Sequence, residues 1–148
     1  ILTVGSMAVL NPLEQIKKSS DAKRKTELTQ LQRALDLYYQ DTGRYPASSS
    51  NYRIVSGSTT LSWGSAWQPY IRKLPADPSM NKVYVYYSPA SANGQTYYLY
   101  ANLERGSKDP QACNAGNACT SLSAAGFPAS NACGAVCNYG ASSTNVTP

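Results

Sequence analysis

The fold is decided by residues 1–43, which read ILTVGSMAVLNPLEQIKKSSDAKRKTELTQLQRALDLYYQDTG. We expect them to form one long helix whose surface changes character along its length. Such a helix spans about 60 Å at about 1.5 Å per residue. A chain of 148 residues folds into a domain with a radius of gyration of about 15 Å. The N-terminal part of the helix therefore has to project from the domain.

Residues 1–10 are apolar on every side except at Thr3, Gly5 and Ser6. A helix that is apolar all round is buried in protein or in lipid, but these residues cover only about half a bilayer and lack the basic start of a signal peptide. We expect the tail end of a longer hydrophobic segment, with an N-terminal core strand as the alternative. The candidate subunit contacts are Ile1, Leu2, Val4, Met7, Ala8, Val9, Leu10, Leu13 and Ile16.

Residues 17–27, KKSSDAKRKTE, are polar on all sides except at Ala22. A polar helical stretch usually bridges packed regions, and the acid-before-base pairs Glu14–Lys18 and Asp21–Lys25 would support it in water. We expect either a solvated neck or a groove for nucleic acid or anionic headgroups. The candidate contacts form a basic collar of Lys17, Lys18, Lys23, Arg24 and Lys25.

The rest of the helix carries an apolar stripe, because Leu28, Leu31, Leu35 and Tyr38 recur at helical spacing with Ala34 beside them. This pattern predicts packing on a core. Gly43 is suited to end the helix, and Pro46 prevents its resumption. At the other end, Asn11 and Pro12 predict either a helix start or a bend.

Composition argues against catalysis. The chain has a net charge of +5, and 14% of its residues are charged, against about 25% in typical soluble domains. It contains no His, which excludes a Ser–His–Asp triad, and it lacks a nucleophile elbow, a phosphate loop and an H-E-x-x-H motif. We expect a protein that is not an enzyme and needs no cofactor.

All the cysteines, Cys113, Cys119, Cys133 and Cys137, lie in the last third of the chain. Their even number and their setting favour disulfides in an oxidising compartment. A zinc site is the alternative, but the spacings depart from the usual zinc-binding pairs. Of the three pairings that are possible for four cysteines, we favour the local pairs 113–119 and 133–137, although a crossed or nested pairing would stabilise the tail more.

Val83–Tyr87 and Tyr97–Ala101 predict two strands of a hairpin. By alternation we place one set of side chains inward, against the helix: Val83, Val85, Tyr87, Tyr97, Leu99 and Ala101. The other set, Tyr84, Tyr86, Tyr98 and Tyr100, would form an outward ladder, either as ordinary cross-strand packing or as a contact surface for another copy. Beyond the hairpin, Glu104 and Asp109 are weak candidates for a calcium loop.

Three of these stretches carry a family resemblance: ELTQLQRALDLYYQDTGRYP (Glu27–Pro46), YIRKLPADP (Tyr70–Pro78) and YYLYANLE (Tyr97–Glu104). In this order, after an apolar helix end, the chain resembles type IV pilins and the major pseudopilins of type II secretion over about residues 1–104. The cysteine-bearing tail resembles the disulfide-bounded region of many pilins.

The resemblance implies an α+β subunit in which a long N-terminal helix packs on a small antiparallel sheet, with a disulfide-bonded C-terminal region. It divides the chain into a projecting helix, residues 1–27, and a head, residues 28–148. The helix would have an apolar filament-core end at 1–16 and a polar neck at 17–27. The head would contain the hairpin at 82–103 and the Cys-rich tail at 104–148.

The resemblance also implies a function. Identical subunits would be held in the inner membrane, trimmed by a prepilin peptidase and added by the assembly machinery to an extracellular type IV pilus used for adhesion, motility or DNA uptake. One alternative is a type II secretion pseudopilin, which more often carries a calcium loop. The other is a minor pilin that binds DNA or a surface.

Overall fold

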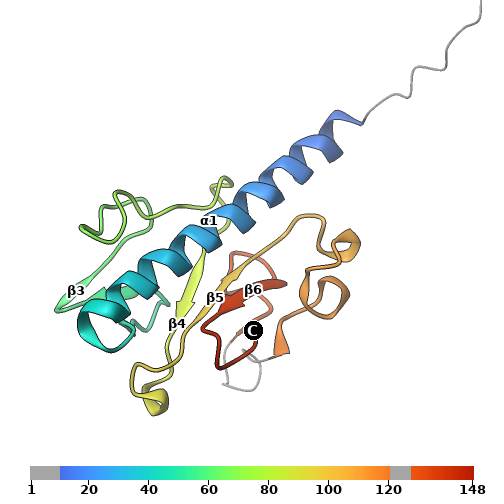
Figure 1. Cartoon of the computed structure of the whole chain (residues 1–148). Helices are drawn as coiled ribbons and strands as arrows, with labels where there is room; N and C mark the ends of the chain where they lie inside the picture. The colour runs from blue at the N-terminus through green and yellow to red at the C-terminus, as the bar shows by residue number, and fades with distance from the viewer. Residues whose placement is uncertain (1–10, 121–127) are drawn as a thin grey trace, which may run out of the picture.

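The computed structural model describes residues 11–120 and 128–148, and its backbone is one long helix lying along short antiparallel strands (Figure 1). The helix, α1 (Pro12–Thr42), begins as a capped helix does, because the side chain of Asn11 accepts a hydrogen bond from the Leu13 N–H at 3.2 Å. It ends at Gly43, whose left-handed φ of 73° suits glycine. The predicted end at Gly43 is confirmed, and of the two alternatives at Asn11 and Pro12 the structure shows a helix start. Residues 1–10, the first part of the expected long helix, lie outside the described residues.

The body of α1 supplies one side of the main core. Leu28, Leu31, Ala34 and Leu35 are buried, and Tyr38 packs against them. The predicted stripe is therefore confirmed as a core-facing surface. Burial of such side chains is the dominant favourable term in folding, so this stripe determines where the helix docks.

The strands form two small sheets. The first has the order β1-β2-β3 and consists of β1 (Ala47–Ser48), β2 (Ile54–Ser56) and β3 (Thr59–Thr60). The second has the order β4-β5-β6 and consists of β4 (Val85–Tyr87), β5 (Tyr98–Ala101) and β6 (Tyr139–Ser142). Short 3-10 turns connect the strands of the second sheet in sequence. The turn η1 (Ala90–Ala92) lies between β4 and β5, and η2 (Gly106–Lys108) and η3 (Cys113–Gly116) lie between β5 and β6.

The predicted hairpin is confirmed as β4 and β5, which pair antiparallel with Tyr86 opposite Leu99. The third strand, β6, was not predicted. It comes from the C-terminal tail and pairs with the other side of β5, with Ala141 opposite Leu99.

The predicted faces of β4 are wrong. Tyr84 and Tyr86 point to the helix and are buried with its leucines, whereas Val85 lies in a second cluster on the opposite face. A tyrosine ring can pack against α1 in the core while its hydroxyl still finds a hydrogen-bond partner. That of Tyr84 donates to Glu27, and that of Tyr86 donates to the carbonyl of Pro46 at 2.6 Å.

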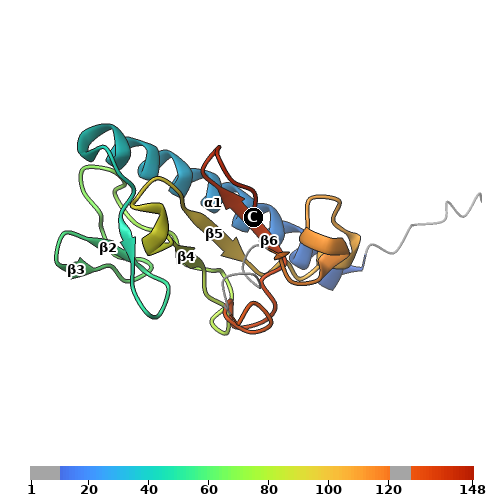
Figure 2. The ribbon, with the colours of Figure 1, turned by 90° about the horizontal axis from the view of Figure 1, so that it is seen from below.

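For β5 the predicted faces hold, since Tyr97, Leu99 and Ala101 belong to the helix-side core. The other face is not an open ladder, however. Tyr100 is fully buried against Val85 and the tail cysteines, and Tyr98 stacks on it with ring centroids 6.1 Å apart. The sheet is thus covered on both faces, by α1 on one side and by the C-terminal region on the other (Figure 2).

The architecture is α+β, as expected. The N-terminal turns of α1 run on past the strands, towards the end of the molecule where the 103–117 loop lies (Figure 1). In the part of the chain that the structure describes, no helix is long and apolar enough to span a bilayer. The division into a projecting helix and a head remains a prediction.

Candidate functional site

The candidate site is the base of the head, which we define as residues 12–25 of α1 together with the loop 103–111. Its most exposed apolar groups are Leu13, which is 58% exposed, and Ile16, which is 62% exposed. They lie one helical turn apart and therefore on one side of α1. The other predicted subunit contacts, within residues 1–10, lie outside the described residues.

A buried ion cluster joins α1 to the head just after these turns. The Arg24 guanidinium is 1% exposed and contacts Asp21 at 2.8 Å, Asp77 at 2.9 Å and Glu104 at 3.6 Å. Burial alone would disfavour its charge, but the hydrogen bond and the charge of Asp77 outweigh burial and raise the pKa of Arg24 above its ordinary value. Arg24 is therefore a structural cation and cannot serve as the anion contact that was predicted.

Asp21 fixes the loop to the helix. Besides Arg24, its carboxylate accepts hydrogen bonds from the backbone N–H groups of Glu104 and Arg105, both at 2.9 Å. Sequence reasoning missed Asp21 and Asp77 as members of this cluster. The three-residue spacing of Asp21 and Arg24 is a usable local signal, but Asp77 lies 53 residues from Arg24 and no local pattern connects them.

Lys25 also turns inward. Its ammonium lies 2.6 Å from the Asp109 carboxylate and 2.8 Å from the side-chain oxygen of Gln111, and it sits over the ring of Tyr139. The predicted pair Asp21–Lys25 is therefore wrong, because each partner is used elsewhere. Glu14 pairs with Lys17 at 3.6 Å, and its predicted partner Lys18 is exposed.

Three residues of the predicted collar remain at the surface. Lys18 and Lys23 are exposed, and the Lys17 side chain is 34% exposed. A role in binding nucleic acid stays a prediction that depends on these three lysines alone.

The two calcium candidates are engaged by cations of the chain. Glu104 pairs with Arg24 and with Lys82, each at 3.6 Å, and Asp109 pairs with Lys25. Burial would raise the pKa of Asp109, but the hydrogen bonds from Lys25 and Gln111 outweigh it and lower that pKa. Among the described residues, no group of three or more acidic, His or Cys side chains could hold a metal ion.

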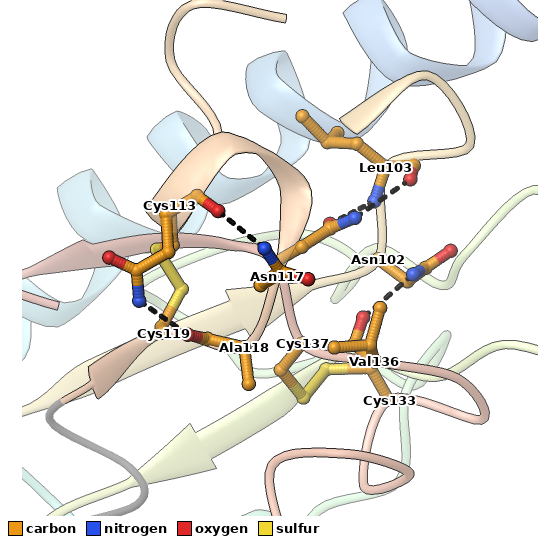
Figure 3. Close-up of a disulfide and its surroundings, with 11 residues drawn as sticks. Asn102, Leu103, Cys113, Asn117, Ala118, Cys119, Cys133, Val136 and Cys137 are labelled. Atoms are coloured by element: carbon orange, nitrogen blue, oxygen red, sulfur yellow. Dashed lines mark hydrogen bonds between the residues drawn. A yellow bond between two sulfur atoms is a disulfide. The ribbon is translucent and has the colours of Figure 1, made fainter. Parts of the chain in front are cut away.

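The C-terminal region is held by two disulfides, which are the two local pairs, Cys113–Cys119 and Cys133–Cys137 (Figure 3). Three of these cysteines are fully buried. The two loops also bond to each other, because the Cys119 N–H donates to the Cys137 carbonyl at 3.0 Å.

Two asparagines fasten this region to the segment that directly follows the strand β5. The Asn138 side chain accepts from the Leu103 N–H at 2.7 Å and donates to the Leu103 carbonyl at 3.1 Å. The Asn102 amide donates to the carbonyl of Val136 at 2.7 Å (Figure 3). Both asparagines are buried, and sequence reasoning missed them because a lone Asn in a loop carries no pattern.

Comparison with known proteins adds one finding to this geometry. No match was found among curated proteins or among solved structures. A family model described as "Type II secretion system (T2SS), protein G" matches residues 11–116, from the cap of α1 through η3. This match covers more than half of the chain and includes the helix, the hairpin and the ion cluster. The chain therefore belongs to the type II secretion system protein G family, and it is a pilin- or pseudopilin-like protein.

Proposed function

We propose that this chain is a structural subunit that polymerises through its N-terminal helix into a filament. One observation carries the proposal. Leu13 and Ile16 are more than half exposed, and they continue an apolar stretch of residues 1–10. A helical stretch that is apolar on all sides is normally covered by lipid or by other protein.

Assembly of identical copies would cover this surface. Apolar area removed from water contributes about 25 cal/mol per Å², so helices packed side by side gain stability with every subunit added. Contacts that repeat without closing generate a helical filament. Family membership supports this structural role and gives no reason to expect catalysis.

The family favours a pseudopilus of type II secretion, with subunits held in the inner membrane until the secretion machinery adds them. A second candidate is an extracellular type IV pilus. It is favoured by residues 117–148, which lie beyond the family match and contribute β6 and the Cys133–Cys137 disulfide. Disulfides suit any oxidising compartment outside the cytoplasm, and the cysteine-bearing tail resembles the disulfide-bounded region of many pilins.

Deletion of the gene in the native cell, followed by electron microscopy and by measurement of exported proteins, tests both candidates. Loss of export without loss of surface filaments supports the pseudopilus. Loss of surface filaments with normal export supports the pilus. If cells are unchanged and the purified chain forms only dispersed monomers, the proposal of a filament subunit is wrong.

A further inference from the structure

Four cations from two distant parts of the chain gather at the base of the head: Lys17 and Lys18 on α1, and Arg105 and Lys108 on the loop 103–111. We propose that this basic cluster binds the anionic headgroups of a phospholipid membrane. This inference rests on the proposed function, because a subunit that waits in a membrane before assembly brings its base close to the lipid surface.

The charge of the cluster is unbalanced. The carboxylate of Glu14 lies among these cations, at 3.6 Å from Lys17, 3.1 Å from Arg105 and 3.9 Å from Lys108. Lys18 is exposed beside them. Four positive charges and one negative charge leave an excess of three positive charges. The adjacent ion pairs reduce this excess by one charge, because Arg24, Lys25 and Lys82 face four carboxylates, those of Asp21, Asp77, Glu104 and Asp109. The cluster together with these ion pairs therefore keeps an excess of two positive charges.

The cluster is held in place before any ligand arrives. Asp21 is 3% exposed and binds two backbone N–H groups at the start of the loop. Arg24 in turn fixes Asp21. The cations of the loop are therefore positioned next to those of α1 by hydrogen bonds to a buried carboxylate. Fewer side chains and less of the loop have to become ordered when a ligand binds.

The surface offers two hollows that can receive headgroup phosphates. The first has a volume of about 340 Å³ and includes Lys18, Arg105 and Lys108 in its lining. The second has a volume of about 500 Å³, with Lys17 at its edge and Lys82 opposite. Residues of η2 line both hollows, and the cations of the loop, Arg105 and Lys108, line the first.

The apolar neighbours of the cluster favour a membrane over nucleic acid. Leu13 and Ile16 are exposed within one turn of Lys17, and the apolar residues 1–10 precede them. Cations next to an apolar helix segment match the boundary between headgroups and acyl chains, where each Lys or Arg adds attraction to anionic lipid. A DNA backbone would instead place its phosphates against leucine and isoleucine side chains.

Vesicle flotation of the full chain tests the proposal, using vesicles of phosphatidylcholine alone and of phosphatidylcholine mixed with phosphatidylglycerol. The quantity measured is the ratio of the two affinities, since insertion of the apolar end contributes to both. We expect Lys18→Gln/Lys108→Gln to lower this ratio about 25-fold, at about fivefold per cation, and high salt to lower it as well.

The matched control is Arg33→Gln/Arg44→Gln, which removes the same charge from exposed positions near the other end of α1 and should leave the ratio unchanged. An equal effect of both variants, or an absent preference for anionic vesicles at low salt, overturns the proposal. Binding of a DNA duplex through Lys18 and Lys108, with no discrimination between vesicles, also overturns it, in favour of nucleic acid.

Electron microscopy of the same preparations separates this proposal from the proposed function. Filaments without an anionic preference refute the membrane contact alone. An anionic preference that depends on Lys18 and Lys108, in a chain that never polymerises, refutes the filament role alone.

Discussion

Arg24 is the residue at which α1 and two loops of the head meet. Its guanidinium satisfies Asp21 on its own helix, Asp77 after the first sheet and Glu104 after β5. The ion pairs of Arg24 with Asp21 and Asp77 are buried. The cluster is therefore stable only when every charge in it has its partner. A buried ion pair contributes little net stability when intact but costs much when one partner is removed.

We expect Arg24→Ala to lower the free energy of unfolding by about 3–5 kcal/mol, because two buried carboxylates lose their counter-ion. Urea unfolding followed by circular dichroism measures the change. The control is Lys23→Ala at the adjacent exposed position, which should change stability by less than about 1 kcal/mol. Equal losses for the two variants would show that Arg24 has no special role.

Asp109 predicts a dependence of stability on pH. Its pKa is lowered in the folded chain by Lys25 and Gln111, against the effect of burial. A carboxyl whose folded pKa is lowered stabilises the fold above its ordinary pKa of about 3.9, and this contribution is lost as the pH falls through the folded value.

Asp109→Asn should therefore lose less stability than the wild type between pH about 5.5 and pH about 3. Urea unfolding at both pH values measures this difference, and Asp36→Asn, near the other end of α1, serves as the control. If the wild type and Asp109→Asn lose the same stability on acidification, the Lys25–Asp109 contact makes no contribution.

At the scale of elements, the C-terminal region replaces regular secondary structure with covalent links. The disulfides close short loops, with sequence separations of 6 and 4 residues. In the chain-entropy model each such loop stabilises the folded state by about 2 kcal/mol. The region also covers Val85 and Tyr100, so its order matters for the sheet beneath it.

Replacing both cysteines of one disulfide by Ala should lower the free energy of unfolding by about 2 kcal/mol, for either pair. Unfolding in urea with and without a reductant measures it, and a variant that lacks both disulfides should not respond to the reductant. If a reductant destabilises the variant that lacks both disulfides as much as it destabilises the wild type, its effect is not due to the disulfides.

The elements differ in how far the sequence predicts them. The stripe of α1 and its end at Gly43 follow from local periodicity and backbone preference, so both could be predicted. The face of β4 could not, because tyrosine suits either side of a sheet and its burial depends on hydroxyl partners such as Glu27 and Pro46. β6 pairs about 40 residues away from β5 in sequence, which no local pattern indicates.

The site shows the same division. The exposed Leu13 and Ile16 could be read from an apolar run, and so could a collar of cations. The sequence could not predict that Arg24 is buried, that Lys25 is paired and that Lys18 is exposed. These differences depend on carboxylates that arrive from positions 77 and 109.

At the scale of the whole molecule, folding and assembly use different parts of α1. The core is built on Leu28, Leu31 and Leu35, whereas Leu13 and Ile16 lie outside the described core clusters. The head should therefore tolerate changes at the exposed end that abolish polymerisation.

We expect Leu13→Gln/Ile16→Gln to change the free energy of unfolding by less than about 0.5 kcal/mol, as exposed substitutions usually do, and to reduce filament yield strongly. Thermal unfolding and electron microscopy measure the two effects. Leu37→Gln, a substitution at a site 47% exposed near the other end of α1, is the control. A comparable loss of filaments from Leu37→Gln would contradict a specific role for the N-terminal turns.

The position of the Arg24 cluster has a mechanical consequence for such a filament. Tension along the filament would be carried by the helices and would enter each head through the ion pairs near the N-terminal end of α1, which are partly exposed at Glu14 and buried at Asp21 and Arg24. The ion pairs to Asp77 and Glu104 would then be loaded in shear together, before any leucine of the core is pulled. A subunit built this way resists pulling along its helix better than peeling away from it.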